Sequence, residues 1–372
     1  MSDKSLKVLA LCSYPREAAA TRFRIDQFVG PLAEHGIDVE ISPFLDSEGF
    51  KSFYRDGDAF EKVLKGVAGL VNRIGDLANS GKYDLVFVQR EAMFFGPEAF
   101  EWLFNKFKGL PLVLDLDDAT YVRYKSPRFG RLGSSLKFFG KTDRLIDRAQ
   151  TVVCGNRFIA EYVEERGGRA VVIPTVVDLD VFRPPEEQND PPVIGWIGTH
   201  STYPLLESVF PALTRLFSEY DFVLRIIGSG RDRVEVEGVR VENLLWSLER
   251  EVEDFRSLDI GLYPIKVSSS ANEEWLKGKS GFKAVQYMAV GVPFVMSPVG
   301  VCRELGVPGK THFNAVSDED WYNSLKILLS DPDRRKIMGL SAREFAEANF
   351  AVAQQVEKLV AVLRDAAGER RR

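Results

Sequence analysis

A glycine- and lysine-rich loop, residues 277–283, directly precedes an apolar helical pattern that runs to Ala289. Backbone N–H groups at a helix N-terminus have no partner within the helix, and together with the helix dipole they attract phosphate. Lys279 and Lys283 add full positive charges there, and Gln286 follows about one turn further on, within reach of a ribose. The loop therefore predicts a site for a nucleotide diphosphate. The alternative is a solvated basic helix start.

Three aspartates lie at the end of a buried strand pattern over residues 112–116, namely Asp115, Asp117 and Asp118. Carboxylates gathered at a sheet edge cost free energy unless they are hydrogen-bonded or bind something. A metal-binding Asp-x-Asp is one interpretation. Capping of the following turn is another.

Arginines are concentrated after the first strand pattern, at Arg16, Arg22 and Arg24. A guanidinium group favours bidentate contact with phosphate, so these residues are predicted to meet a phosphate of the acceptor or donor. Surface ion pairs are the alternative, since Asp26 is near in sequence.

A basic segment, residues 123–148, holds eight Lys or Arg against Asp143 and Asp147, with Phe138 and Phe139 among them. Basic residues interleaved with aromatic ones suit an anionic membrane surface, so the segment predicts peripheral membrane contact. An ordinary solvated helix and loop is the alternative.

Short apolar runs that alternate with helical patterns must position all these residues. Alternation of this kind predicts a parallel sheet covered by helices on both faces. The predicted strands are residues 7–12, 37–43, 84–89, 112–116, 151–154 and 171–174, then 193–197, 222–227, 259–263 and 293–296. The predicted helices include residues 22–35, 205–220, 321–329, 334–350 and 352–363.

A linker rich in proline and charge, residues 178–192, separates the two series. We therefore expect an α/β protein with two Rossmann-like domains that face each other across a cleft. The predicted N-terminal domain is 1–180 and the predicted C-terminal domain is 190–350. A helix and tail, 351–372, are expected to pack back toward the N-terminal domain.

Composition excludes several classes of protein. With 372 residues, 45% hydrophobic and 28% charged, the chain suits two globular domains rather than disorder. A net charge of -5 gives no reason to expect nucleic acid as a partner. Three scattered cysteines and three scattered histidines form no metal pattern. No signal peptide or membrane span is recognisable, so we expect a cytoplasmic protein, at most peripheral at the inner face of the membrane.

The second half of the chain resembles the GT-B retaining glycosyltransferases of family 4. Their donor helix reads like Glu-Ala-Met-Ala-x-Gly-x-Pro-Val-Val, and this chain has Gln-Tyr-Met-Ala-Val-Gly-Val-Pro-Phe-Val from Gln286. Residues 258–264 resemble the family's preceding strand, 172–184 its interdomain signature, and 226–230 its glycine turn facing the nucleotide. The matches run in the right order over residues 150–345.

Two departures from the family pattern stand out. The family's paired glutamates fall on Gly278 and Gln286, as in a sub-branch with a lysine-rich donor loop. The Arg and Lys that many members carry after the first strand of the second domain are replaced by Gly198-Thr-His-Ser-Thr. The phosphate charge is therefore expected to fall on Lys279 and Lys283, with help from Ser280 and backbone amides.

The resemblance implies the remaining site residues. The donor nucleotide is expected to contact Gly198, Thr199, Gly228, Trp246, Lys279, Ser280, Gly281, Lys283 and Gln286. Asp117 and Asp118 occupy the positions of the family's His-Asp, and are the expected catalytic residues. They would orient or deprotonate an acceptor hydroxyl, or stabilise positive charge on the sugar.

The implied function is transfer of a sugar from a UDP- or GDP-linked donor to a hydroxyl of a glycan, lipid-linked or small-molecule acceptor, as in polysaccharide biosynthesis. Retention of configuration, no metal and no further cofactor are expected. A non-catalytic nucleotide-sugar binding protein and a nucleotide-sugar epimerase remain alternatives, because fold analogy alone does not choose among them.

Overall fold

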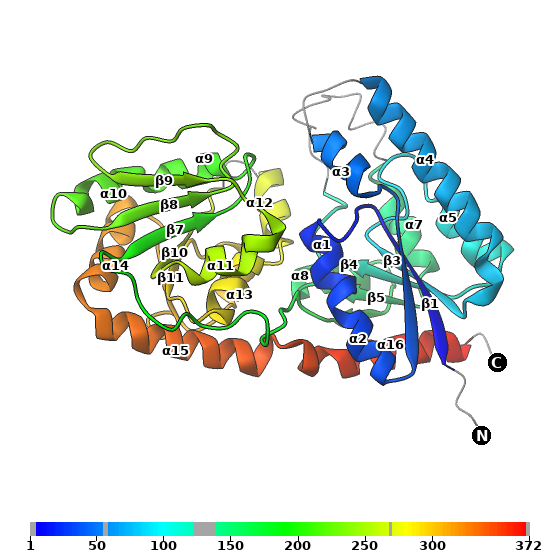
Figure 1. Cartoon of the computed structure of the whole chain (residues 1–372). Coiled ribbons are helices and arrows are strands. Elements are labelled where there is room, and N and C mark those ends of the chain that lie inside the picture. The colour runs from blue at the N-terminus through cyan, green and yellow to red at the C-terminus, as the bar shows by residue number, and fades with distance from the viewer. Residues whose placement is uncertain (1–4, 55–58, 123–137, 268–269, 370–372) are drawn as a thin grey trace. The chain divides into compact units, whose positions relative to one another are not determined.

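The computed structural model describes residues 5–54, 59–122, 138–267 and 270–369. The chain divides into two compact units. The first comprises Met1–Val176, Ser270–Ser280 and Val352–Arg372, and the second comprises Val177–Ser269 and Gly281–Ala351. Each unit is built on one six-stranded parallel sheet (Figure 1). The predicted α/β class with two Rossmann-like domains is confirmed.

The first unit has the strand order β2-β1-β3-β4-β5-β6, and every neighbouring pair is parallel. These strands are apolar runs buried on both faces, as a parallel sheet requires. Their bounds are β1 Leu6–Cys12, β2 Ile37–Pro43, β3 Leu85–Gln89, β4 Leu112–Leu116, β5 Thr151–Cys154 and β6 Ala170–Val172.

Helices cover both faces of this sheet. They are α1 Ala19–Thr21, α2 Gln27–Glu34, α3 Ser47–Tyr54, α4 Ala59–Ala78, α5 Ala99–Trp102, α7 Lys141–Arg148, α8 Arg157–Glu164, α12 Ser270–Lys277 and α16 Val352–Glu369. Short π-helical and 3-10 turns also occur, at η1 Arg22–Asp26, η2 Ser80–Lys82 and η3 Leu103–Phe107. Successive residues of β1 face opposite helix layers. Leu9 packs in the core with α5, α7 and α8, whereas Val8 faces α2 and α16.

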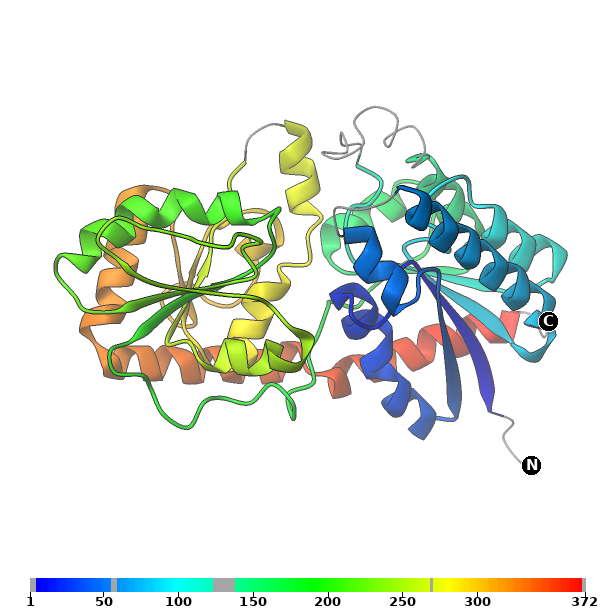
Figure 2. The same ribbon diagram turned by 45° about the horizontal axis from the view of Figure 1, so that its top comes forward.

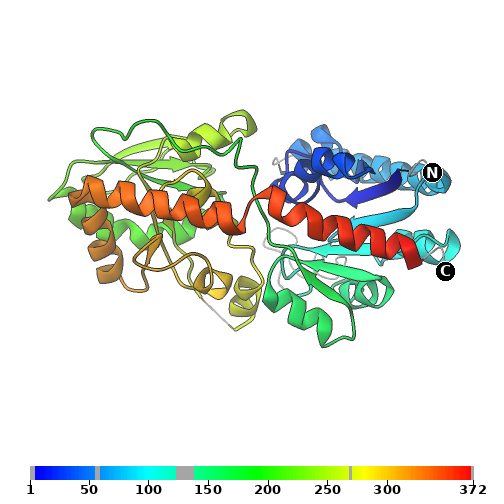
Figure 3. The ribbon, with the colours of Figure 1, turned by 90° about the horizontal axis from the view of Figure 1, so that it is seen from below.

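The C-terminal helix α16 packs on the first unit, as the sequence predicts (Figure 3). Leu359 and Leu363 line one small cavity together with Phe28 and Leu32 of α2. The Arg364 guanidinium also donates to the His35 carbonyl at 2.8 Å. The last helix of the chain therefore completes the layer that the first helices begin.

The second unit has the strand order β12-β11-β10-β7-β8-β9, again all parallel. Its strands are β7 Val193–Ile197, β8 Val223–Ile227, β9 Arg240–Leu244, β10 Ile260–Tyr263, β11 Phe294–Met296 and β12 His312–Asn314. Its helices and turns are α9 Tyr203–Leu206, η4 Glu207–Val209, α10 Phe210–Phe217, η5 Leu248–Arg250, α11 Glu251–Arg256, α13 Phe282–Ala289, η6 Gly300–Arg303, α14 Asp318–Ser330 and α15 Pro332–Asn349.

Local sequence explains where the last helices of this unit begin. Ser317 and Asp320 form a reciprocal capping box that satisfies free N–H groups at the start of α14. The Asp331 carboxylate accepts from the Arg334 N–H, and Pro332 takes the first helical position of α15. These signals fix both helix starts before any packing is considered.

The chain does not cross between the two units within the predicted linker. It crosses after Val176, Ser269, Ser280 and Ala351. The segment 178–192 belongs to the second unit, where carbonyls of Leu179 and Phe182 accept from Arg343 of α15. Residues 270–280, predicted as part of the C-terminal domain, are counted with the first unit. The reason is packing, since α12 brings Trp275 against the cluster of Ala119, Tyr121 and Val122.

Candidate functional site

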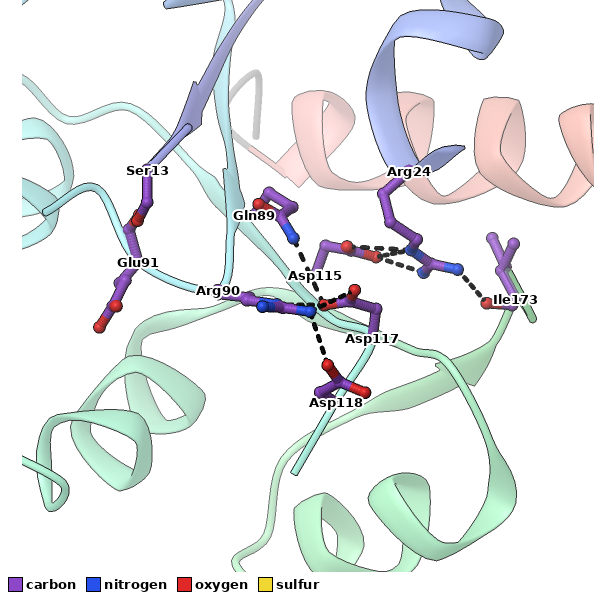
Figure 4. Close-up of polar contacts among 9 residues, drawn as sticks. All are labelled: Ser13, Arg24, Gln89, Arg90, Glu91, Asp115, Asp117, Asp118 and Ile173. Atoms are coloured by element: carbon purple, nitrogen blue, oxygen red, sulfur yellow. Dashed lines mark hydrogen bonds and ion pairs between the residues drawn. The ribbon is translucent and has the colours of Figure 1, made fainter. Parts of the chain in front are cut away.

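The carboxyl ends of β3 and β4 bring the predicted acids together in the first unit (Figure 4). In the parallel register Gln89 lies beside Asp115, so the residues that follow both strands emerge at one sheet edge. Ligands of open α/β sheets bind at such carboxyl edges. The aspartates thus occupy the position where the sequence places a site.

Arg90 holds both predicted catalytic aspartates. Its Nε lies 2.5 Å from Asp117 Oδ1, and its Nη2 lies 2.7 Å from Asp117 Oδ2 and 2.8 Å from Asp118 Oδ2. The Gln89 amide also donates to Asp117, at 3.3 Å. The backbone of Arg90 has φ +63°, a left-handed conformation that is uncommon for residues other than glycine. Strained backbone of this kind is found at functional sites, where the surroundings enforce it.

The two aspartates differ in what they offer a substrate. Burial is the largest single influence on the pKa of Asp117 and raises it, but the charge and hydrogen bonds of Arg90 together with the charge of Arg24 hold that pKa below its ordinary value. Asp117 is 5% exposed and is therefore a fixed anion inside the edge of the sheet. The Asp118 side chain is 24% exposed, so it is the better placed of the two to touch an acceptor.

Asp115 and Arg24 form a buried ion pair beneath this edge. The Arg24 Nε lies 3.1 Å from Asp115 Oδ2, and its Nη1 donates to the Ile173 carbonyl at 2.8 Å. Arg24 is only 3% exposed. The predicted phosphate contact of Arg24 is therefore corrected. A buried guanidinium that is paired with Asp115 does not reach a phosphate at the surface.

The other two predicted arginines lie nearer solvent. Arg16 is 69% exposed on its side chain and pairs with Asp26 at 3.4 Å. Arg22 donates to the carbonyls of Arg16 and Glu17, both at 3.1 Å, and thereby closes the loop on itself. The contact of Arg16 is therefore a local surface ion pair, which is the alternative that the sequence left open.

The lysine-rich loop is divided between the two units. Lys279 stacks its ammonium over the Trp275 ring at 3.8 Å, and its carbonyl accepts from the Asn156 amide at 3.1 Å, all within the first unit. A Cβ at Gly278 would lie 2.1 Å from the Ala119 Cβ, directly after the predicted catalytic aspartates in the sequence. The family's first glutamate therefore has no room in this chain, which accounts for one departure from the pattern.

Lys283 belongs to the second unit, in the first turn of α13. Gly281 precedes the helix with φ +62°, a conformation that suits glycine. The Lys283 ammonium lies 5.2 Å from the centre of the Trp196 ring and 5.6 Å from that of Tyr263, at the ends of β7 and β10. The helix start and this cation form one positive corner at the carboxyl edge of the second sheet.

Gln286 is the buried polar group of this corner. It is 4% exposed, and within the described chain its Nε2 has no hydrogen-bond partner. A buried amide without a partner costs free energy, so such a group indicates a missing ligand or a functional role. Gln286 therefore lies one turn from Lys283 on α13, and its contact with a ribose stays a prediction.

The predicted glycines meet at the ends of β7 and β8. Gly228 has φ +78°, and a Cβ there would lie 2.4 Å from the Gly198 carbonyl oxygen. It would also lie 3.3 Å from the Cβ of Trp246, whose side chain is 37% exposed. Thr199 is exposed beside them. Gly198, Thr199, Gly228 and Trp246 thus lie together at one edge, and their contact with a donor stays a prediction.

The structure describes only residues 138–148 of the basic segment 123–148. Arg123, Lys125, Arg128, Arg131 and Lys137 lie outside the described residues. Lys141 is buried, with its ammonium 2.6 Å from Glu91 Oε2, and Arg144 pairs with Glu98 at 2.6 Å. The interpretation of Lys141 as a membrane contact is therefore wrong. Among the helices that the structure describes, none is long and apolar enough to span a membrane.

Sequence reasoning missed Arg90, Trp196 and Tyr263. Arg90 carried a usable signal, because a charged residue that directly follows a buried strand must emerge at the carboxyl edge. Trp196 lies inside an apolar run and carried no such signal.

In the described part of the chain, no group of three or more His, Cys, Asp or Glu could hold a metal ion.

Solved structures show which fold this is. A glycosyltransferase from Rickettsia africae ESF-5 matches with TM-score 0.68 and 15% identity over 98% of this chain and 99% of that chain. Sucrose-phosphate synthase from Thermosynechococcus elongatus matches with TM-score 0.66 and 14% identity over 96% and 98%. Anabaena HepE in complex with UDP matches with TM-score 0.65 and 16% identity over 97% and 100%.

The fold is therefore GT-B, the two-domain fold of these glycosyltransferases. Similarity at this level of identity establishes architecture and no more. No family model matches the sequence. No curated protein matches it either.

Proposed function

We propose that the protein is a glycosyltransferase that moves a sugar from a nucleotide diphosphate to an acceptor hydroxyl. The observation that carries this proposal is the corner of the second unit where Lys283 and the unpartnered amide of Gln286 share one face of α13. A cation at a helix start suits a diphosphate, and an amide one turn later suits a ribose. HepE has been solved with UDP and with UDP-glucose, which supports a uridine nucleotide as the first ligand to try.

The acceptor side is proposed to be the edge held by Arg90. Transfer breaks the bond from the anomeric carbon to the phosphate oxygen and forms a bond to the acceptor oxygen, whose proton must leave. Asp118 is the more exposed of the two carboxylates and is available to orient that hydroxyl and to accept its proton, while Asp117 remains an anion that stabilises positive charge on the sugar. The leaving diphosphate would be neutralised by Lys283 and the N–H groups of α13, so turnover is expected without a metal.

The family resemblance further favours retention of configuration, and a glycan, lipid-linked or small-molecule acceptor. A cytoplasmic enzyme with at most peripheral membrane contact remains part of the proposal. No cofactor beyond the nucleotide sugar is proposed. Lys279 stays a proposed donor contact, and within its own unit its ammonium lies over the Trp275 ring.

Calorimetry with UDP, GDP and inorganic pyrophosphate tests the donor site. Lys283→Ala should weaken binding of all three ligands by about 1–3 kcal/mol, because one charge-assisted contact is lost. Gln286→Leu should weaken binding of the nucleotides more than that of pyrophosphate. Gln286→Glu is expected to keep nucleotide binding, since the resembling family has glutamate there.

Lys326→Ala is a matched control, because that lysine pairs with Glu219 elsewhere on the same unit. Unchanged nucleotide affinity in Lys283→Ala would remove the donor site from α13. Equal losses for pyrophosphate and nucleotides in Gln286→Leu would leave that residue a purely structural role.

A second candidate function is nucleotide-sugar binding without catalysis. The observation in its favour is that Arg90 already contacts both predicted catalytic carboxylates. Incubation with radiolabelled nucleotide sugars and mixed acceptors separates the two functions. Label on an acceptor, or hydrolysis of the donor, supports the transferase. Tight binding with neither product supports the binding protein.

A further inference from the structure

Helix α4 exposes an apolar face along most of its length. The large apolar side chains that are at least half exposed are Phe60, Val63, Leu64, Val67, Val71 and Ile74, at 67, 62, 52, 50, 61 and 59%. Contiguous apolar patches of this kind on a folded protein mark an interaction surface. Figure 2 shows α4 (blue) on the outer surface of the first unit.

The opposite face of α4 fixes the rotation of the helix about its axis. Arg73 is fully buried there and donates to the carbonyls of Cys12 and Ala92, at 2.7 and 2.8 Å. At Gly69 a Cβ would lie 2.5 Å from the Phe44 carbonyl oxygen, so the helix backbone lies directly on the loop after β2. The helix therefore cannot turn its exposed apolar face inward without breaking these contacts.

The spacing of the exposed residues matches a helical partner. Leu64, Val67, Val71 and Ile74 follow one another at intervals of three, four and three, and Ala78 extends the series by four. An apolar repeat of this form, 3.5 residues on average, is the seam along which two helices pack side by side. The face is thus shaped for another helix rather than for an extended peptide.

Charge favours a partner with the same apolar face. On a helical wheel the exposed apolar residues span one side of α4, and Glu61 is the charged residue at its border. Lys65 lies outside this face and pairs with Glu48 at 3.1 Å. A surface with no charge along its seam opposes no like charges when it meets its own copy, and a two-fold dimer needs such self-complementarity.

We propose that a second copy of this chain docks on this surface, with α4 packed against α4 of the partner. Full burial of such a side chain removes roughly 60–120 Å² from water, so the six partly exposed ones offer on the order of 300 Å² per copy. A standard interface buries about 800 Å² per partner, and the dimer is therefore reversible and concentration-dependent. This assignment does not depend on the proposed function.

Sedimentation velocity of the full chain over a wide concentration range tests the proposal. The wild type should shift from monomer toward dimer as concentration rises. Val71→Glu and, separately, Val67→Glu should weaken association at least tenfold, because each places a charge in the seam. Ile337→Glu, at an equally exposed position of α15, should associate like the wild type.

Thermal unfolding of each variant at low concentration checks that the fold is intact, and both α4 residues are exposed enough for the substitution to be tolerated. A wild type that stays monomeric at every concentration overturns the proposal. So does a dimer that survives both α4 substitutions. Wild-type monomer that co-sediments with neutral phosphatidylcholine vesicles, and loses this with Val71→Glu, would assign the face to lipid instead.

Discussion

Arg90 is the residue that organises the sheet edge at the ends of β3 and β4. Its guanidinium bridges Asp117 and Asp118 from a left-handed backbone position, so one side chain sets the charge and the direction of two. A bidentate arginine–carboxylate pair of this kind is geometrically specific. The edge is therefore a pre-built arrangement, and a lysine at position 90 would not reproduce it.

Asp117→Asn should reveal this arrangement in the dependence of stability on pH. The folded pKa of Asp117 lies below its unfolded value of about 3.9, so its contribution is present above pH 4 and is lost as pH falls through the folded pKa. The difference in unfolding free energy between wild type and Asp117→Asn should therefore shrink on acidification from pH 7 to pH 3. Urea denaturation at both pH values measures it. A difference that stays constant would mean that Arg90 does not stabilise the charged form.

His312 gives a second pH dependence, of opposite physical origin. Burial lowers its pKa to about 4, and the ring lies between Thr311 and Asn314 while stacking on Phe294. The folded protein therefore resists protonation that the unfolded chain accepts near pH 6.5. Stability should be complete above pH 6.5 and should fall by about 3 kcal/mol on acidification to pH 4, through this residue.

The His312→Gln variant isolates that effect. It is less stable than wild type at pH 7 because the ring stacking is lost, but its unfolding free energy should change less between pH 6.5 and pH 4. Parallel slopes for the two proteins would show that His312 is not the group responsible. The measurement uses urea midpoints, with the denaturant slope held in common.

At the scale of elements, the loop between α12 and α13 is tied to both units by different residues. Gly278 lies against Ala119 in the first unit, whereas Gly281 lies against Leu305 in the second. A side chain at either position meets an occupied site. The loop therefore tolerates no Cβ at these two glycines without a local shift.

Gly278→Ala should destabilise the attachment of α12, because its Cβ would come within 2.1 Å of the Ala119 Cβ. Overpacking of this kind typically costs about 1–3 kcal/mol. Hydrogen exchange of residues 273–280 should accelerate in the variant. Adding Ala119→Gly should restore part of the protection, since the opposing methyl is removed while backbone contacts remain. Gly30→Ala, where nothing lies within 4 Å, is the control.

The sequence predicts most of the framework because its strands are apolar runs that end at glycine, proline or charge. The strands that both begin and end within one residue of their predicted bounds are β1, β2, β3, β4, β5, β7, β8, β10 and β11. β9 and β12 were missed, since one is a partly exposed edge strand and the other has three residues. The membership of α12 was not predictable, because packing on Ala119 and Tyr121 is a long-range contact that no local pattern encodes.

The sequence predicts some of the candidate-site residues for similar reasons, and their binding roles stay predictions. Lys283, Gln286 and Gly228 follow from motifs whose residues are close in sequence. Arg24 was assigned to phosphate because its partner Asp115 is 91 residues away. The sequence pattern places Lys141 at the surface because its partner Glu91 lies 50 residues earlier in the chain. A sequence shows that a residue is charged. Whether that charge is free to bind a ligand depends on ion-pair partners that are distant in sequence.

At the scale of the whole molecule, α16 is part of the first unit although it follows the whole second unit in the chain. Leu359 and Leu363 cover Phe28 and Leu32, and Asp365 pairs with Arg169 at 2.8 Å. Removal of this helix would expose one layer of the first core. The N-terminal residues therefore do not contain all the information that their own unit needs.

Truncation before Val352 should lower the stability of the first unit by several kcal/mol, because several buried apolar side chains of α16 are lost. A synthetic peptide of residues 352–369, added in trans, should restore part of the lost stability in proportion to its concentration. Tryptophan or circular-dichroism melting follows the recovery. A scrambled peptide of the same composition is the control, and equal rescue by both peptides would contradict the specific role of α16.

The same feature sets the order of events during synthesis on the ribosome. Residues 177–351 hold the whole second sheet and its helices, and they leave the exit tunnel before α16 does. The C-terminal unit can therefore reach its native packing while the N-terminal one still waits, the reverse of the usual vectorial sequence in which earlier domains mature first. A released chain that ends at Ala351 would carry a protease-resistant second unit and a protease-sensitive first one.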